Sequence, residues 1–129
     1  MIAMLLSGCI GNGGVTKAQN TVEQFMQAII DKDINTISNL SASQIFLWNM
    51  YFVTHQVFVN DLWQRDLDND YHRDLTYSIE QITQAGSDSI VELDTAFHIT
   101  PYGVDVTQTW WFTINDKGLV IGYNLLNTW

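Results

Sequence analysis

The chain has 129 residues, the size of one domain, and 47% of them are hydrophobic, which is too apolar for a disordered tail. Fourteen acidic residues against five basic ones give a net charge of −9, which repels a phosphate backbone and argues against nucleic acid as a partner. The single cysteine rules out an internal disulfide and a cysteine-based metal site.

The first residues resemble a lipoprotein signal that ends in a lipobox. Residues 1–6 are apolar, and the small residues Ser7 and Gly8 stand directly before Cys9, the only cysteine. In lipoproteins with this pattern, the cysteine thiol accepts a diacylglycerol and becomes the first residue of the mature protein. The resemblance implies a lipid on Cys9.

The start departs from a complete signal in one respect. Such a signal has a basic region and an apolar stretch of about 7 to 15 residues, whereas no Lys or Arg precedes Lys17 here. An ordinary N-terminus with an incidental cysteine is the alternative. On the lipoprotein interpretation, residues 1–15 are a truncated signal and a Gly-rich tether, and 16–129 form one domain. The protein would then sit in the cell envelope, on the outer side of the cytoplasmic membrane or in the periplasm.

The domain begins with a predicted amphipathic helix. Thr16-Lys17-Ala18-Gln19 matches a capping box. Asp31-Lys32-Asp33 ends the helix, and Asp33 or Asn35 can cap a short second helix that runs to Leu40. Apolar residues at helical spacing form the buried face of the first helix: Val22, Phe25, Met26, Ile29 and Ile30.

Periodicity alone does not distinguish a helix from a strand in the next segment. Ser41 and Gln44 match another capping box, and residues 45–63 are apolar nearly all round. Strand-forming residues fill the middle of this stretch, yet we predict a helix with a break near Asn60.

The C-terminal half alternates apolar and polar residues and predicts a four-stranded antiparallel meander. Residues 86–88, 101–103 and 115–118 supply its three turns. We expect the helices to cover one face: Leu75, Tyr77, Ile79, Val91, Leu93, Thr95, Phe97, Ile99, Val104, Val106, Gln108, Trp110, Phe112, Ile114, Leu119, Ile121, Tyr123 and Leu125. The opposite face is polar with one large aromatic: Glu92, Asp94, His98, Thr107, Thr109, Trp111 and Thr113.

A capped helix, an Asp-Lys-Asp break, further helices and a long-stranded meander that contains Trp110-Trp111-Phe112 resemble the nuclear-transport-factor-2-like superfamily, also called the cystatin-like cone. The resemblance covers residues 16–129 and is in particular to the small envelope lipoproteins of unknown function in that superfamily. The resemblance implies an α+β cone, in which a curved sheet wraps around helices and often encloses an apolar pocket. The relatives that the resemblance implies include isomerases, dehydratases and proteins with no catalytic activity. Many of them form dimers through the sheet face. No catalytic residue carries over.

The predicted pocket lining combines aromatic residues with polar residues of the covered sheet face, since buried polar groups need partners or a wet pocket. A histidine inside the apolar stretch joins it because histidine often acts as a general acid or base. The candidates are Trp48, Phe52, His55, Thr95, Gln108, Trp110 and Tyr123. For a dimer face we single out His98, Thr109 and Trp111.

Two acidic patterns point only weakly to chemistry. Asp94 and His98 share a strand face, but about 13 Å separates such Cα atoms. Residues 66–70 space three carboxylates like the start of a calcium loop, but Tyr71 and Tyr77 replace the required Gly and Glu. We therefore predict neither a catalytic residue nor a metal or cofactor.

The sequence favours a non-catalytic, lipid-anchored envelope domain that binds a small apolar ligand or an envelope protein. One alternative is an acid/base enzyme of the isomerase or dehydratase kind that uses His55 or another pocket group. A second is a structural homodimer that associates through the face around Trp111.

Overall fold

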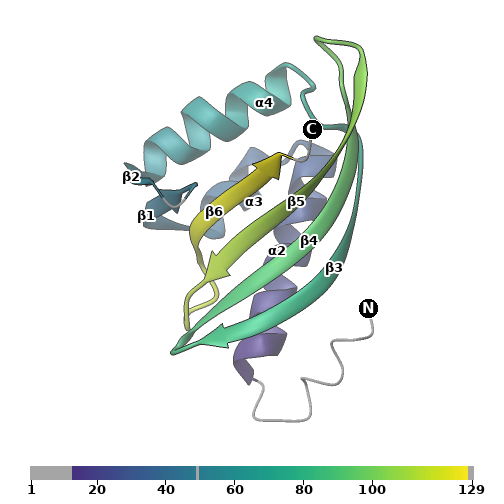
Figure 1. Ribbon diagram of the computed structural model, residues 1–129. Coiled ribbons are helices and arrows are strands. Elements are labelled where there is room, and N and C mark those ends of the chain that lie inside the picture. The colour runs from purple at the N-terminus through teal and green to yellow at the C-terminus, as the bar shows by residue number, and fades with distance from the viewer. Residues whose placement is uncertain (1–12, 49, 128–129) are drawn as a thin grey trace.

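The computed structural model describes residues 13–48 and 50–127 (Figure 1). Helices α2 (Gly13–Asp31) and α3 (Ile34–Asn39) come first, followed by strands β1 (Ser41–Leu47) and β2 (Tyr51–Thr54). The π-helix η1 (Val57–Gln64) continues directly into α4 (Arg65–Asp68). Four long strands follow: β3 (Arg73–Ala85), β4 (Asp88–Ile99), β5 (Val104–Ile114) and β6 (Val120–Asn127).

The two N-terminal helices follow the predicted pattern closely. Helix α2 begins at Gly13, three residues before the predicted cap at Thr16. The Asp33 carboxylate accepts a hydrogen bond from the Thr36 backbone N–H at 3.2 Å and so caps α3. All the predicted apolar residues of α2 are buried except Ile30. No helix in the described ranges has the length and hydropathy needed to cross a membrane.

The described strands form one six-stranded sheet in the order β2-β1-β6-β5-β4-β3. Strands β3 to β6 pair antiparallel in sequence, which confirms the predicted meander and its three turns. The predicted sheet was nevertheless too small. Strand β1 pairs in parallel with β6 and antiparallel with β2, so the sheet is mixed.

The helix predicted over residues 45–63 is wrong in its first half. Ser41 opens strand β1 instead of capping a helix, and its hydroxyl donates to the Ile37 carbonyl at 2.7 Å. Within β1, Ile45 and Leu47 are buried and flank the half-buried Phe46. A helix here would leave the edge of β6 that faces away from β5 without a partner strand. As strands, β1 and β6 satisfy each other's backbone hydrogen-bonding groups. Short apolar runs do not distinguish the two structures by periodicity.

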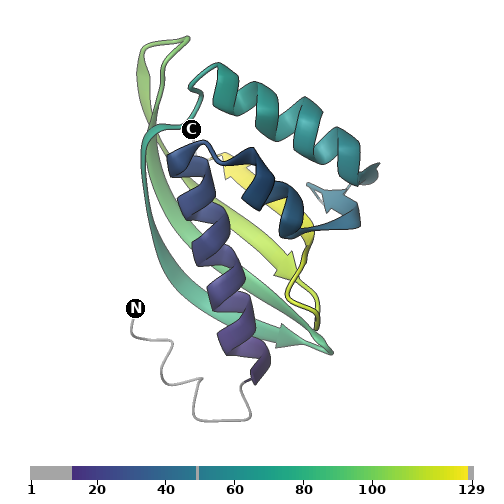
Figure 2. The same ribbon diagram turned by 180° about the vertical axis from the view of Figure 1, so that it is seen from behind.

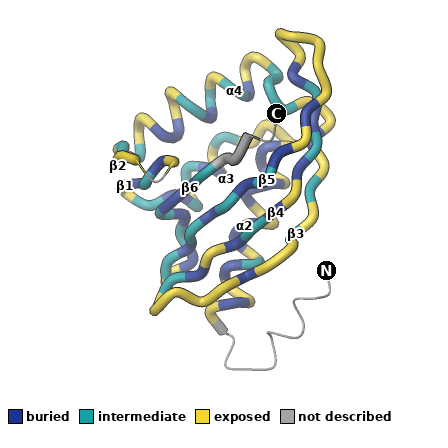
Figure 3. Tube along the Cα trace, viewed as in Figure 1, coloured by how far each residue is buried: buried dark blue, intermediate teal, exposed yellow. Residues whose placement is uncertain are grey.

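The core lies between the helices and one face of the sheet, which we call the inner face (Figures 2 and 3). Most residues predicted for the covered face are buried or half-buried, but Val104 is exposed, and the side chain of Leu125 lies outside the described part. A register shift between Thr113 and Ile114 turns Ile121 away from the core, because the bulge interrupts the alternation. The opposite side of the sheet is the outer face.

Candidate functional site

Four of the predicted pocket residues are packed in the core on the inner face. Thr95, Gln108, Trp110 and Tyr123 are all less than 10% exposed. The polar groups of three of them bond to one another: the Thr95 hydroxyl donates to the Gln108 carbonyl at 2.9 Å, and Trp110 Nε1 donates to Gln108 Oε1 at 2.9 Å. The rings of Trp110 and Tyr123 pack together and against Trp63. Aromatic rings therefore fill the space in which these residues were expected to line a pocket.

The other three predicted pocket residues lie away from that cluster. Trp48 and Phe52 are exposed, Phe52 by 63%. His55 is half-buried, and its Nε2 donates to the Ser38 carbonyl at 2.9 Å, which ties the chain after β2 to helix α3. The structure thus does not bring the seven residues together in one inner-face pocket, and His55 is part of a structural link between elements.

The three residues predicted for a dimer face do share the outer face. His98 is on β4, and Thr109 and Trp111 are on β5. Asp94 and His98 each bond across the strands instead of to each other: Asp94 accepts from the Thr109 hydroxyl at 3.3 Å, and His98 Nδ1 donates to Asp105 Oδ1 at 2.8 Å. The considered Asp94–His98 pair is therefore not formed.

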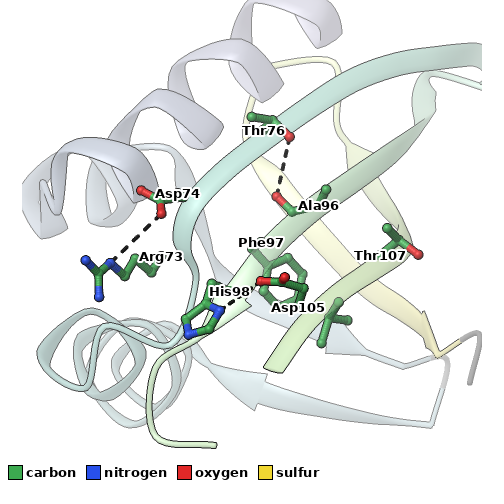
Figure 4. A pocket seen from close by; sticks show the side chains of 9 residues that line it. Arg73, Asp74, Thr76, Ala96, Phe97, His98, Asp105 and Thr107 are labelled. Atoms are coloured by element: carbon green, nitrogen blue, oxygen red, sulfur yellow. Dashed lines mark hydrogen bonds and ion pairs between the residues drawn. The ribbon is translucent and has the colours of Figure 1, made fainter. Parts of the chain in front are cut away.

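A shallow pocket of about 550 Å³ surrounds the His98–Asp105 pair (Figure 4). Arg73 and Asp74 border it from the start of β3, and their side chains form an ion pair at 4.0 Å. Asp105 is 92% exposed, so water competes for its bond to His98. Exposed pairs of this kind hold their partners weakly. This pocket has acid/base groups but lacks the burial that would fix them for catalysis.

A second hollow on the outer face is apolar, and we call it the outer-face groove. Its volume is about 640 Å³, within the range of small-molecule sites. The Phe46 and Phe52 rings, whose centroids are 4.8 Å apart, border it on the side of β1 and β2. Ten uncharged residues line the groove: Gln44, Phe46, Phe52, Ile90, Trp111, Thr113, Ile121, Gly122, Tyr123 and Asn124.

Gly122 sets the depth of the outer-face groove. In the sheet it stands between Phe46 on β1 and Thr113 on β5. A Cβ atom at this position would lie 3.1 Å from both Cβ and Oγ1 of Thr113, closer than ordinary van der Waals contact. Glycine therefore leaves the backbone as the floor of the groove, between aromatic residues on one side and Ile90 and Trp111 on the other.

A buried imidazole, His72, beside a partly exposed carboxylate, Asp66, was not foreseen from the sequence. The His72 side chain is only 6% exposed, and its Nδ1 has no hydrogen-bond partner. Asp66 Oδ2 lies 3.8 Å from this Nδ1. The rings of Trp63, Phe97 and Trp110 surround the imidazole, with centroids 4.6 to 5.7 Å from it. His72 follows α4 in the connection to β3, outside the helical and the alternating patterns, so no periodic signal marks it.

Burial shifts both groups of this pair away from their usual ionisation. It lowers the pKa of His72 to about 4, because the charged imidazolium is disfavoured among aromatic rings. It raises the pKa of Asp66 to about 6, and the nearby Arg65 partly opposes this shift. Burial also raises the pKa of Tyr123 well above its usual value. Near neutral pH, Asp66 is thus a carboxylate base close to its titration range.

The acidic segment 66–70 makes its contacts within the protein. Asp70 forms a salt bridge with Lys32 at 3.1 Å and accepts a hydrogen bond from the Thr100 hydroxyl at 3.2 Å. No cluster of three or more His, Cys, Asp or Glu side chains suited to a metal ion occurs within residues 13–48 and 50–127. Cys9 and the lipobox-like residues lie outside those ranges.

No family model and no curated protein matches this sequence. Solved structures do match. A putative ketosteroid isomerase from Shewanella frigidimarina aligns with a TM-score of 0.70 and 16% identity, over 88% of this chain and 98% of the other. An epoxide hydrolase of M. tuberculosis, described as LEH-like, aligns with a TM-score of 0.63 and 17% identity, over 88% and 84%.

A third similar structure has no known function. It is an NTF2-like protein from Cytophaga hutchinsonii, with a TM-score of 0.57 and 12% identity over 86% of this chain and 89% of the other. Identities this low establish architecture and not activity. The chain therefore has the nuclear-transport-factor-2-like, or ketosteroid isomerase-like, α+β fold, with N-terminal helices on a curved, mixed six-stranded sheet.

Proposed function

We propose that this protein is a non-catalytic, lipid-anchored domain of the cell envelope that binds a small, neutral, apolar molecule in the outer-face groove. The groove carries the proposal, because it combines a suitable volume, aromatic walls and a glycine floor. The polar side chains of Gln44 and Asn124 are available to orient the bound molecule. The anchor rests on the lipobox-like Ser7-Gly8-Cys9.

The charges around the groove favour a neutral small molecule over a second copy of the chain. None of the groove residues is charged, although the whole chain carries −9. Glu92, Asp94 and Asp105 lie on the same outer face. Two copies that met face to face would bring these acidic residues together, and like charges across an interface are unfavourable. A small molecule in the groove avoids that repulsion.

Binding of the neutral dye N-phenyl-1-naphthylamine tests the groove, because its fluorescence rises in apolar surroundings. Phe52→Ser removes a ring from one wall, and Ile90→Asp places a charge at the other. Loss of a partly buried phenyl contact of about 1.5 kcal/mol weakens binding about tenfold. Tyr102→Ser is the matched control, since Tyr102 is 68% exposed and lies outside the groove. Equal affinity of all four proteins would refute the groove as the binding site.

The anchor and the homodimer need separate tests. Metabolic labelling with a palmitate analogue should mark the protein and fail to mark Cys9→Ala; membrane association of both proteins without label would refute lipidation. The structural homodimer through Trp111 predicts that Trp111→Ala dissociates a dimer in sedimentation. A monomeric parent protein would eliminate that alternative.

The partly exposed Asp66 beside the buried His72 favours a second candidate function, an acid/base enzyme of the isomerase or dehydratase kind. Asp66 also lines a surface pocket of about 510 Å³ together with Tyr71 and Tyr102, through which a substrate would reach the carboxylate. The base-catalysed ring opening of 5-nitrobenzisoxazole probes this carboxylate directly. We expect a rate that rises with pH through about 6, as Asp66 loses its proton, and that Asp66→Asn abolishes. A rate no greater than that of buffer would eliminate the enzyme.

A further inference from the structure

The start of helix α2 is fixed at one end of the domain. The Lys17 ammonium group donates to the Asp116 carbonyl at 2.8 Å, and the buried Thr21 hydroxyl donates to the Gly118 carbonyl at 2.7 Å. Both acceptors lie in the β5–β6 turn. The β3–β4 turn lies at the same end of the sheet, whereas the β4–β5 hairpin lies at the other (Figure 1). We call the end with the α2 start and these two turns the turn end.

The length of the chain between Cys9 and α2 decides which end would face the membrane. Cys9 precedes Gly13 by four residues, and a fully extended chain of that length spans at most about 14 Å. The 19 residues of α2 extend about 28 Å along the domain. A lipid on Cys9 can therefore reach a bilayer at the turn end, but it falls short of one placed beyond the far end of α2.

The outer-face groove begins at the turn end. Ile90 is the third residue of β4 after the β3–β4 turn, and it pairs with Thr113, the last but one residue of β5. Ile121 is the second residue of β6. At about 3.3 Å per residue, this part of the groove lies within about 10 Å of the turns. An anchored domain would thus hold the groove close to the lipid headgroups.

The turn end does not share the strong negative charge of the whole protein. Lys17 and Lys117 supply two of the five basic residues, and they balance Asp88 and Asp116 at the same end. The excess of acidic residues therefore lies elsewhere on the chain. Approach of this end to a membrane surface has a correspondingly small electrostatic cost.

From these observations we propose that the apolar molecule in the outer-face groove is an acyl chain of an uncharged or zwitterionic phospholipid, taken from the membrane to which Cys9 holds the protein. The inference rests on the proposed function and names its ligand class. The uncharged lining selects a hydrocarbon chain, and the position of the groove beside the turn end supplies its source.

The test attaches the full chain to vesicles through Cys9, which is the only cysteine, using a maleimide phospholipid in phosphatidylcholine. The photoreactive residue p-benzoylphenylalanine replaces one exposed residue at a time: Ser87 at the turn end, Phe52 on the groove wall, or Tyr102 in the β4–β5 hairpin as the control. Mass spectrometry identifies each adduct and separates phosphatidylcholine from the tethering lipid.

We expect phosphatidylcholine adducts at Ser87 and Phe52, at least tenfold above those at Tyr102, and loss of the Phe52 adduct when Ile90→Asp is added. Adducts mainly at Tyr102 would overturn the orientation. Phe52 adducts with the tethering lipid or with a second copy would overturn the ligand. If Phe52 captures no lipid while the neutral dye still binds the groove, the acyl-chain inference fails and the proposed function stands. If the dye fails as well, both fall.

Discussion

Replacing Asp66 with Asn should expose the acid sensitivity of the buried His72. In the folded protein the imidazole has no hydrogen-bond partner at Nδ1 and is enclosed by aromatic rings, so its pKa falls from 6.5 to about 4. Between these two values the unfolded chain binds a proton that the folded chain does not bind. The folded state consequently loses stability as the pH falls from 6.5 towards 4.

The size of this loss follows from the shift. One pKa unit corresponds to about 1.36 kcal/mol, so the full shift of His72 is worth about 3.4 kcal/mol, and about 2 kcal/mol of it is lost by pH 5. Asp66 acts in the opposite direction. Its pKa rises from 3.8 to about 6 on folding, so the folded state binds its proton first and gains stability as the pH falls through 6. Asp66 is about one-third exposed, which reduces its contribution.

The assay is urea unfolding at pH 7.5 and pH 5.0, followed by far-ultraviolet circular dichroism. Asp66→Asn removes the compensating carboxyl, and we expect it to lose about 2 kcal/mol more between the two pH values than the double variant Asp66→Asn/His72→Leu. The parent protein should fall between them. Parallel pH profiles of the single and the double variant would refute a buried, neutral His72.

Three further predictions concern the elements that position the site. Gly118→Ala should lower the free energy of unfolding by about 1 to 3 kcal/mol, because Gly118 has a φ of +80° and an added Cβ would lie 3.0 Å from the Lys17 side chain. Gly86→Ala should lower it by less, because Gly86 has a φ of +67° but no atom near the added Cβ. Thr21→Val should cost about 1 to 2 kcal/mol by leaving the Gly118 carbonyl unpaired. Asp33→Ala should lower the free energy of unfolding through loss of the α3 cap. Chemical denaturation measures the free energy of unfolding of each variant. A loss below 0.3 kcal/mol for Gly118→Ala or Thr21→Val would contradict the role assigned to that contact.

The sequence predicts the parts of the fold whose pattern is periodic and whose turns are chemically marked. The buried face of α2, the Asp33 cap and the meander from β3 to β6 are of this kind. Strands β1 and β2 were missed because they are stabilised by pairing: β1 pairs with β6, which is distant in sequence, and β2 pairs with β1. No local sequence pattern encodes the pairing with β6. The same tertiary pairing overrides the capping signal at Ser41, whose hydroxyl bonds back to α3 instead.

The candidate site was harder to predict than the fold. Phe52, Trp111 and Tyr123 were singled out, but in two different groups, because the groove forms only once β1 and β2 join the sheet. Ile90 was recognisable, since it stands next to the buried Val91 and alternation places it on the outer face. Ile121 was assigned to the wrong face because a bulge shifts its register. His72 lies in the connection between α4 and β3, where no periodic pattern predicts whether a residue is buried.

The fold alone does not indicate which site is functional, and the packing of side chains in the interior helps to distinguish the candidates. Similar structures include a putative isomerase, a hydrolase and a protein of unknown function, so the backbone alone is compatible with each. In this chain the rings of Trp63, Trp110 and Tyr123 pack together on the inner face, and chemistry at His72 would require these rings to separate. Binding in the outer-face groove requires no such rearrangement, because Gly122 already leaves the floor open. The two sites lie on opposite faces of the sheet, so evidence for one does not weaken the other. The groove, unlike the buried imidazole of His72, is open to a ligand without reorganisation of the core.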